Sequence, residues 1–321
     1  MILIGDLRLP RNGDYPIPGS WNLVLLVAVA ASCAFLLRLA SHGSTWTVVV
    51  AAITFAFLNN TMFALLHESV HGIAHAHRGL NEWIGRLAAA FFPTGLALQR
   101  VFHLAHHARN RTAAEQFDYV HPGDNVVLKY AQWYAILTGL YWLFVPLGGL
   151  VYFIVPRAFQ TRFLGARDSQ LALQTGGASM FAGLADASGV RIRLELLCSA
   201  AVQVAMFQVL DLSWTGWLAC YAAFALNWSS LQYTDHAFSK LDVRDGAWNL
   251  RVNGLTRRLF LNYHHHLAHH RHPQVPWIHL GGLVDRSEER PSFWTIYLQM
   301  WRGPRPLPAN AEIPDAERLA S

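Results

Sequence analysis

The sequence predicts an all-α integral membrane protein with about four transmembrane helices, and three observations support this fold class. First, 53% of the 321 residues are hydrophobic and only 14% are charged, whereas soluble domains carry roughly 25% charged residues. Second, several apolar runs reach the roughly 20 residues that a helix needs to cross a hydrocarbon core of about 30 Å. Third, 13 of the 17 histidines fall in three short windows, 67–77, 103–107 and 264–272, beyond the ends of these runs.

Four apolar segments are expected to cross the membrane. Residues 21–40 and 46–66 are separated by a short polar turn, so they should form a helical hairpin with its outer ends on one side. A later apolar stretch is interrupted by Asp211, and its length suits two tightly connected spans, 196–211 and 213–231, better than one.

A further apolar run, residues 128–155, contains Pro146 and is too short for two crossings. If it crossed once, the arginine-rich segment 157–193 would lie on the opposite side from the histidine-bearing segments, which are also basic. Because Lys and Arg concentrate in cytoplasmic loops, we expect 128–155 to be a kinked, re-entrant or interfacial element. Residues 1–302 should form a single domain, followed by a weakly ordered tail, 303–321.

Composition excludes two other classes of function. The net charge of +5 is spread along the polar segments without a basic block, so no nucleic-acid partner is expected. The cysteines, Cys33, Cys198 and Cys220, lie far apart in apolar runs, which excludes a disulfide framework and a Cys-x-x-Cys metal site.

The first histidine window continues from the second predicted span. His67 and His71 are four residues apart and His75 follows one turn later, so a continuous helix would place the three imidazoles on one face. At the end of the fourth predicted span, Gln232 and His236 are also four residues apart. One such pair is a weak signal, because helical i, i+4 pairs are common by chance.

The second and third windows share one pattern. His103, His106 and His107 occupy positions i, i+3 and i+4, and the third window repeats this spacing from His266 onward. One first-row metal ion accepts roughly four to six ligands, so nine imidazoles predict two ions. Imidazole suits zinc, copper, iron or nickel, and ligand type alone does not name the metal. The nine candidate ligands are His67, His71, His103, His106, His107, His236, His266, His269 and His270.

The three windows contain short histidine motifs, here called boxes: 67–71, 103–107 and 266–270. In this order, and with a pair of predicted spans between the second and the third, they resemble the histidine boxes of the membrane fatty acid desaturase and hydroxylase superfamily. The segment from Asn262 through the third box to Trp277 is similar to that family's third box with its trailing Pro-x-x-Pro-Trp. The resemblance covers roughly residues 21–280, and it implies a four-span protein whose cytoplasmic helical cap holds a non-haem di-iron centre. It also implies that the nine histidines bind the irons and that Gln232 reaches iron directly or through water.

Several neighbouring histidines do not fit a box. His264 could replace His266 as a ligand, but we expect His266, because only it has the i, i+3, i+4 spacing to the last two histidines. The sequence leaves open whether the others bind metal or support its ligands: His75, His77, His265 and His272.

Three carboxylates are expected beside the metal centre. Glu68, Asp118 and Asp235 are placed in the sequence to accept N–H bonds from metal-bound histidines, which orients such ligands. For Asp118, capping of a loop is the alternative. Nearby basic residues are expected at the headgroup plane, as ordinary cytoplasmic charges or as contacts for an anionic part of the substrate: Arg109, Arg111 and Lys129.

From the resemblance we expect a dioxygen-dependent di-iron oxidoreductase that desaturates a fatty acyl chain or related lipid. Hydroxylation of an apolar chain is the alternative on the same scaffold. Electrons would come from an external donor of the ferredoxin or cytochrome b5 type, because no flavin or haem motif is evident. A second alternative is a membrane-embedded zinc metalloprotease, because residues 67–71 read His-Glu-x-x-His. Such an enzyme would leave most of the clustered histidines without a role.

Overall fold

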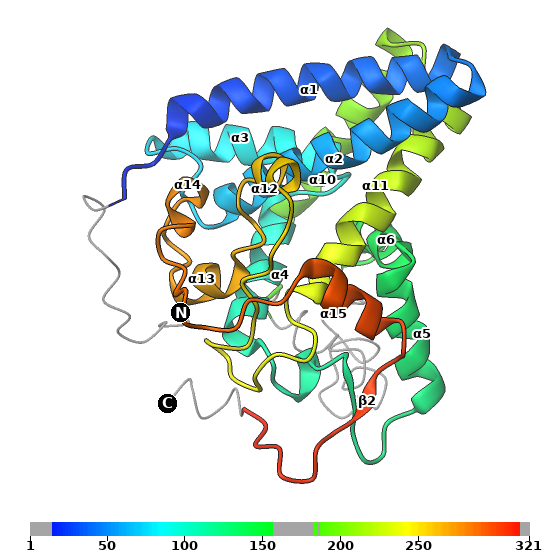
Figure 1. Cartoon of the computed structure of the whole chain (residues 1–321). Helices are drawn as coiled ribbons and strands as arrows, with labels where there is room; N and C mark the ends of the chain where they lie inside the picture. The colour runs from blue at the N-terminus through cyan, green and yellow to red at the C-terminus, as the bar shows by residue number, and fades with distance from the viewer. Residues whose placement is uncertain (1–14, 157–182, 185–186, 315–321) are drawn as a thin grey trace.

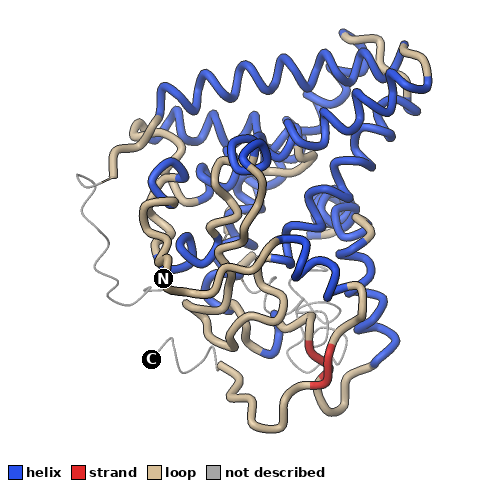
Figure 2. Tube along the Cα trace, in the orientation of Figure 1, coloured by secondary structure: helices blue, strands red, loops and turns tan. Residues whose placement is uncertain are grey.

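The computed structural model describes residues 15–156, 183–184 and 187–314, and within these ranges the protein is mostly helical (Figures 1 and 2). The predicted all-α class is confirmed, with one small departure: β1 (Tyr119–Val120) and β2 (Arg305–Pro306) pair in parallel. The helices in chain order are α1 (Gly19–His42), α2 (Thr45–Val70), α3 (Arg78–Phe91), α4 (Leu96–Arg109), the short 3₁₀ helix η1 (Ala113–Glu115), α5 (Val126–Leu137), α6 (Leu140–Ile154), α10 (Gly189–Val209), α11 (Trp214–Thr234), α12 (Gly254–Leu259), α13 (His266–Arg271), α14 (Trp277–Leu280) and α15 (Phe293–Met300).

In the described part of the chain, α1, α2 and α10 are long and apolar enough to cross a membrane. The first two form a hairpin: α1 runs along the top of Figure 1, and α2 returns beneath it toward the middle of the molecule. α10 begins well before the predicted span 196–211, because the Ser188 side chain accepts the Arg191 N–H and so starts the helix earlier. α11 covers the predicted span 213–231 but is not among these candidate spans, and it packs against both α1 and α2.

The hairpin of α1 and α2 contacts the pair α10 and α11 at the ends of these helices that lie away from the histidine boxes. Arg38 donates a hydrogen bond of 2.7 Å to the carbonyl of Leu210, and the Ser41 hydroxyl accepts the N–H of Ser213. Gly216 allows the chains to approach, because a Cβ there would lie only 2.6 Å from the Ser41 nitrogen. These contacts align α11 with α2 and bring their other ends to the same place.

The run predicted as a kinked element forms α5 and α6, which are bent by 98° relative to each other. The bend is at Gly139, whose φ of 83° favours glycine, and a Cβ there would lie 2.7 Å from the Leu226 nitrogen. This shape fits a broken span or a re-entrant loop, and the re-entrant or interfacial interpretation stays a prediction. Residues 157–182, 1–14 and 315–321, on which parts of the topology, domain and tail predictions rest, lie outside the described residues.

α2 changes its surroundings along its length. Near its start, Val49, Val50 and Ile53 are exposed, whereas every residue from 59 to 70 is buried. The buried half is enclosed by α3, α4, α11 and α12. The apolar half is therefore suited to lipid, and the enclosed half carries the first histidine box into the protein interior.

Candidate metal centre

Nine histidines gather in two neighbouring groups that could each hold a metal ion. They are the nine histidines that the sequence analysis selected. Within a group, one ligand atom from each residue lies within 4.8 Å of all the others. The five-histidine group comprises His67, His71, His103, His107 and His269, and the four-histidine group comprises His106, His236, His266 and His270.

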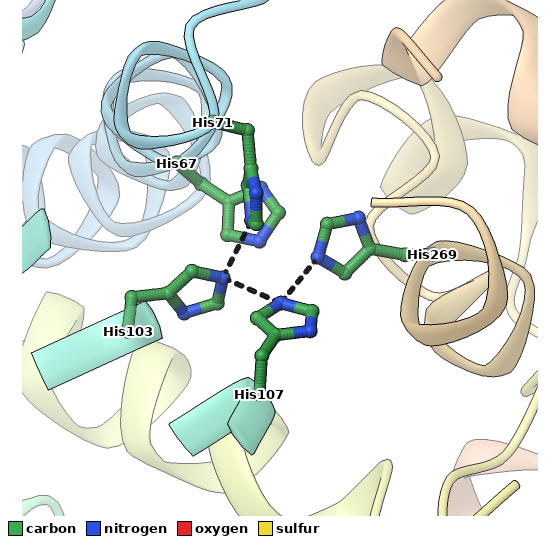
Figure 3. Close-up of side chains that lie close together, drawn as sticks. All are labelled: His67, His71, His103, His107 and His269. Carbon is green, nitrogen blue, oxygen red and sulfur yellow. Dashed lines mark hydrogen bonds between the residues drawn. The ribbon is translucent and has the colours of Figure 1, made fainter. Parts of the chain in front are cut away.

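Ring nitrogens of the five-histidine group point toward one another (Figure 3). The Nε2 atoms of His71 and His103 are 2.8 Å apart, those of His103 and His107 are 3.0 Å apart, and those of His107 and His269 are 2.9 Å apart. His67 completes the group, with its ring centroid 4.4 Å from that of His269. Neighbouring donors on one ion at metal–nitrogen distances of about 2.0–2.1 Å are separated by about 2.9–3.4 Å, so this donor set fits a metal.

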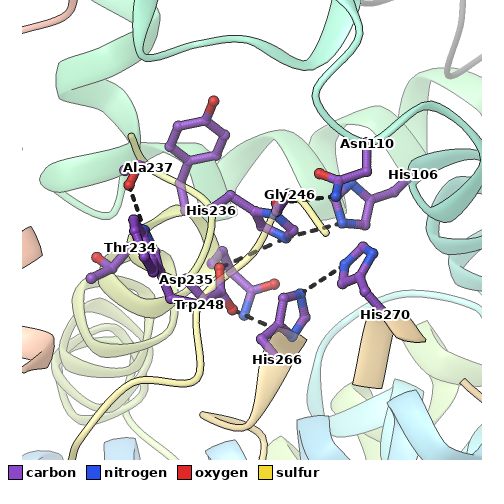
Figure 4. Close-up of polar contacts among 12 residues, drawn as sticks. His106, Asn110, Thr234, Asp235, His236, Ala237, Gly246, Trp248, His266 and His270 are labelled. Carbon is purple, nitrogen blue, oxygen red and sulfur yellow. Dashed lines mark hydrogen bonds and ion pairs between the residues drawn. The ribbon is translucent and has the colours of Figure 1, made fainter. Parts of the chain in front are cut away.

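The four-histidine group has a similar spacing (Figure 4). The Nε2 atoms of His106 and His236 are 3.2 Å apart, as are those of His266 and His270. The His270 ring also stacks on His107 of the other group, with centroids 4.4 Å apart. The two groups are therefore in direct contact through their imidazole rings.

The spacing of the second and third boxes explains how they serve both groups. His103 and His107 of α4 enter the five-histidine group, while His106 enters the other. On an α-helix, position i+4 is rotated by about 40° from position i, whereas position i+3 is rotated by about 60° in the opposite direction. The i, i+4 pair therefore shares one group, and the i+3 residue reaches the second. α13 repeats this division with His266 and His270 against His269.

Burial favours the neutral form of seven of these imidazoles. It is the main cause of the lowered pKa values, and neighbouring histidines lower them further. Neutral imidazole is the form that binds metal ions, so the site presents nitrogen donors at ordinary pH. Seven histidines outside the helices that could cross a membrane have pKa values well below the usual range: His71, His103, His107, His236, His266, His269 and His270.

Polar groups lie behind the rings of the four-histidine group. The Nδ1 of His236 donates to the carbonyl of Gly246 at 2.8 Å, which leaves its Nε2 facing the group. Asp235, one of the three predicted carboxylates, is fully buried, with Oδ2 3.5 Å from the Nδ1 of His266. Glu115 lies 3.3 Å from the Nδ1 of His106. Sequence reasoning missed Glu115, whose only local signal is its position nine residues after this histidine.

The other two predicted carboxylates have different partners. Glu68 accepts the backbone N–H of Trp277 at 3.1 Å, and its nearest approach to the adjacent imidazole, the Nδ1 of His67, is 4.0 Å. Asp118 forms a bidentate ion pair with Arg111, with both N–O distances 2.9 Å. Its contacts tie loops together, in line with the alternative loop role.

The expectation that three basic residues lie at the headgroup plane of the membrane is wrong for two of them, Arg111 and Lys129. Arg111 is fully buried against Asp118, and Lys129 is buried with its Nζ donating to the carbonyl of Gln116. Each cation has oxygen partners inside the protein, which favours burial over exposure at the membrane surface.

Gln232 lies beside the site through Tyr263. The tyrosine hydroxyl donates to the Gln232 Oε1 at 3.4 Å, and the amide nitrogen is buried without a hydrogen-bond partner in the described ranges. The Tyr263 ring lies 5.1 Å from His67 and 5.0 Å from His266, so it contacts both groups. An iron contact by Gln232 stays a prediction.

A small cavity opens next to the five-histidine group, with a volume of about 10 Å³. This is room for about one water molecule. It is lined by Ala64, His67, Glu68, Leu261, Tyr263, His269, Trp277 and Leu280.

The neighbouring histidines that fit none of the three boxes lie outside both groups: His75, His77, His264, His265 and His272. α2 ends at Val70 and the chain turns at Gly72, whose φ is 78°, so the expectation that His75 continues the helical face is wrong. His264 and His265 pack against each other, with ring centroids 3.9 Å apart. This arrangement agrees with the preference for His266 in the third box. The remaining two are His77, which caps the start of α3, and His272, which follows α13.

Comparison with known proteins adds a family to this geometry. Residues 44–298, well over half of the chain, match the family described as fatty acid desaturase. None of the curated proteins matches the chain. The matched range includes both histidine groups, and together with the apolar helices it indicates an integral membrane protein. The chain belongs to the fatty acid desaturase family.

Proposed function

We propose that the chain is a di-iron oxidoreductase that uses dioxygen to desaturate a fatty acyl chain or a related lipid. The observation that carries this proposal is the pair of buried imidazole groups within a member of the fatty acid desaturase family. Groups of five and four nitrogen donors match the coordination needs of two first-row ions. The proposed ligands are the nine histidines, with Gln232 as a further contact to one iron.

Bound iron would supply the activation of dioxygen and the removal of hydrogen from an unactivated C–H bond, which acid–base side chains cannot achieve. The protein's part is to hold and orient the ligands. The carbonyl of Gly246 accepts the Nδ1–H of His236 and Glu115 lies within hydrogen-bond distance of the Nδ1 of His106, so these two groups orient their rings; the carboxyl group of Asp235 lies 3.5 Å from the Nδ1 of His266. The buried setting limits access of water to the reacting chain.

The cavity beside the five-histidine group is the proposed point at which the substrate meets the centre. It lies between the enclosed part of α2, the turn at Leu261 and the short helix α14. Its volume is far below that of an acyl chain, so binding requires these walls to separate. Its mainly apolar lining, with Ala64, Leu261 and Leu280, suits a hydrocarbon segment.

Two features of the cellular setting belong to the proposal. Electrons come from a separate ferredoxin or cytochrome b5 type protein. The protein crosses the membrane several times, and its centre faces the cytoplasm, where the arginines of the histidine-bearing segments are favoured.

The alternatives predict different chemistry at the same residues. A hydroxylase would return oxygen to the carbon from which hydrogen was removed. A zinc protease would use His67 and His71 with one further ligand and would need an open coordination position. Three more imidazoles surround this pair, and Glu68 is engaged by the N–H of Trp277, which favours the oxidoreductase.

The first test is metal content. Protein purified in detergent without chelators should carry about two iron atoms per chain. One tightly held zinc, together with peptidase activity that disappears in Glu68→Gln, would overturn the proposal.

The second test is product analysis in membranes supplied with labelled acyl substrates. Mass spectrometry distinguishes an alkene, formed by loss of two hydrogens, from an alcohol, formed by gain of one oxygen. Alanine at any of the nine histidines should reduce turnover to background. His42→Ala is the matched control, because His42 contacts Asp211 at the far end of the helical hairpin. Its activity should stay near wild type.

A further inference from the structure

The last turn of α2 is held by polar side chains from two other helices. The final carbonyl groups of a helix have no partner within it. Arg100 of α4 donates through Nε to the carbonyl of Val70 at 3.2 Å and through Nη2 to that of Ser69 at 3.0 Å. Asn81 of α3 also donates to the Ser69 carbonyl, at 3.0 Å, and accepts the N–H of Ala74. These contacts fix the end of α2 and the turn that follows it.

Arg100 is on the histidine-bearing face of α4. It precedes His103 by three residues and His107 by seven, and this spacing places the three side chains along one side of a helix. The carbonyls that Arg100 binds come immediately before His71, whose Nε2 lies 2.8 Å from that of His103. The same helix face therefore caps α2 and meets its last imidazole.

A charged cluster holds the Arg100 side chain in this position. Its Nη2 donates to Glu82 at 2.8 Å. Glu82 also binds Arg86 and Arg191, and both of these arginines bind Glu195. Arg86 makes no hydrogen bond to α2 in the part of the chain that the structure describes, although it belongs to the same cluster.

We propose that Arg100 is a positioning residue for the five-histidine group, which sets α4 against the end of α2 so that His71 and His103 meet around one metal ion. Metal sites tolerate ligand displacements of about 0.2 Å. A shift of α4 by one residue along α2 would move its histidines by about 1.5 Å, which is too far for both imidazoles to bind the same ion. The inference rests on the proposed function only for the identity of the metal.

The geometry also explains why arginine suits this position. Its planar guanidinium presents several N–H donors in a fixed arrangement, whereas lysine offers one compact ammonium group. Arg100 uses this arrangement to bind two carbonyls and a carboxylate together. Lysine at this position would keep the charge but lose part of the cap.

The first experiment measures hydrogen exchange in the metal-depleted, full-length protein in detergent. Arg100→Gln should speed exchange over residues 67–77, because the carbonyls that end α2 lose their donors. Arg86→Gln is the matched control: it removes the same charge from the same cluster and should leave exchange in this segment as in wild type. Equal exchange in wild type and Arg100→Gln would overturn the inference.

The second experiment titrates Co²⁺ alone into the same proteins and follows its absorption spectrum. Wild type and Arg86→Gln should bind two ions with matching affinities. Arg100→Gln should lose about 10–100-fold in affinity at one site, the usual effect of removing a group that orients ligands, and Arg100→Lys should lose less. Unchanged affinity at both sites in Arg100→Gln, or an equal loss in Arg86→Gln, would contradict the specific role of Arg100.

Failure of the proposed function gives a different result. Wild-type protein that binds fewer than two cobalt ions would reject the dimetal centre, and the exchange comparison would still decide the role of Arg100. If Arg100→Gln loses protection from exchange throughout the chain, the milder variant Arg100→Lys is measured instead. Faster exchange confined to residues 67–77 in Arg100→Lys supports the inference. Exchange in this segment at the wild-type rate overturns it.

Discussion

The buried ion pair between Arg111 and Asp118 provides a strong test of how the four-histidine group is held. Both side chains are fully buried, and two N–O contacts of 2.9 Å join them. Asp118 also accepts the hydroxyl of Tyr233 at 2.7 Å and the N–H of Phe238 at 2.7 Å. Phe238 follows His236 by two residues, so the carboxylate fixes the loop that carries this proposed ligand.

Asp118→Asn keeps the size of the side chain but removes its charge, which leaves the Arg111 guanidinium buried without a counter-ion. Loss of one partner of a buried ion pair typically costs about 3–5 kcal/mol. At about 2 °C per kcal/mol, the value for large domains, the unfolding temperature should fall by roughly 6–10 °C. Asp245→Asn is the matched control, because its pair with Arg271 is partly exposed and such pairs contribute about 0–1 kcal/mol.

The assay is thermal unfolding of both variants in the same detergent, followed by metal analysis of the folded fraction. Asp118→Asn should unfold well below Asp245→Asn and should lose metal from the four-histidine group. If the two variants unfold within about 2 °C of each other, the buried pair does not hold this loop and the reasoning fails.

Three further predictions follow from other parts of the chain. Gly139→Ala should destabilise the protein by about 1–3 kcal/mol, since φ is 83° and a Cβ would lie 2.7 Å from the Leu226 nitrogen. Gly148→Ala, within α6 and with open space for a Cβ, should stabilise it by about 0.5–1 kcal/mol, and thermal shifts of the same sign would contradict the bend. Metal-depleted protein should lose stability as pH falls below about 6.5, because the buried imidazoles have lowered pKa values and the unfolded chain then binds more protons; an unfolding temperature constant from pH 7.5 to 5.5 would refute this. His266→Ala should abolish one metal site while His264→Ala retains both, and the reverse pattern of metal content would show that the third box has another register.

Local patterns were enough to predict the helical class and the histidines that gather in the interior. Apolar length predicts spans such as α1, and the i, i+4 spacing of His103 and His107 reflects the geometry of a single helix. Neither inference needs knowledge of distant residues. The division of α4 between two groups is also implicit in the i+3 position of His106.

Features that depend on distant contacts could not be predicted in this way. The end of α2 at Val70 depends on donors from Arg100 and Asn81, 30 and 11 residues later in the chain. Asp118 pairs with Arg111, which is only seven residues away but was expected at the membrane surface, and it also accepts the hydroxyl of the distant Tyr233 on α11. A carboxylate near a histidine box in sequence can face away from it in space, because its direction is set by whichever cation the fold brings near.

The second and third histidine boxes each contribute to both groups, and this arrangement explains why so many histidines are used. α4 gives two imidazoles to one group and one to the other, and α13 does the reverse. Neither helix can move relative to the other without changing donor distances in both groups, and the 4.4 Å stack of His107 on His270 joins them directly. An ion bound in one group would therefore restrain the helices that form the other. With ions bound in both groups, this coupling would give the i+3 positions, His106 and His269, a role that an i, i+4 pair alone cannot fill: they would join the two proposed metal sites into one centre.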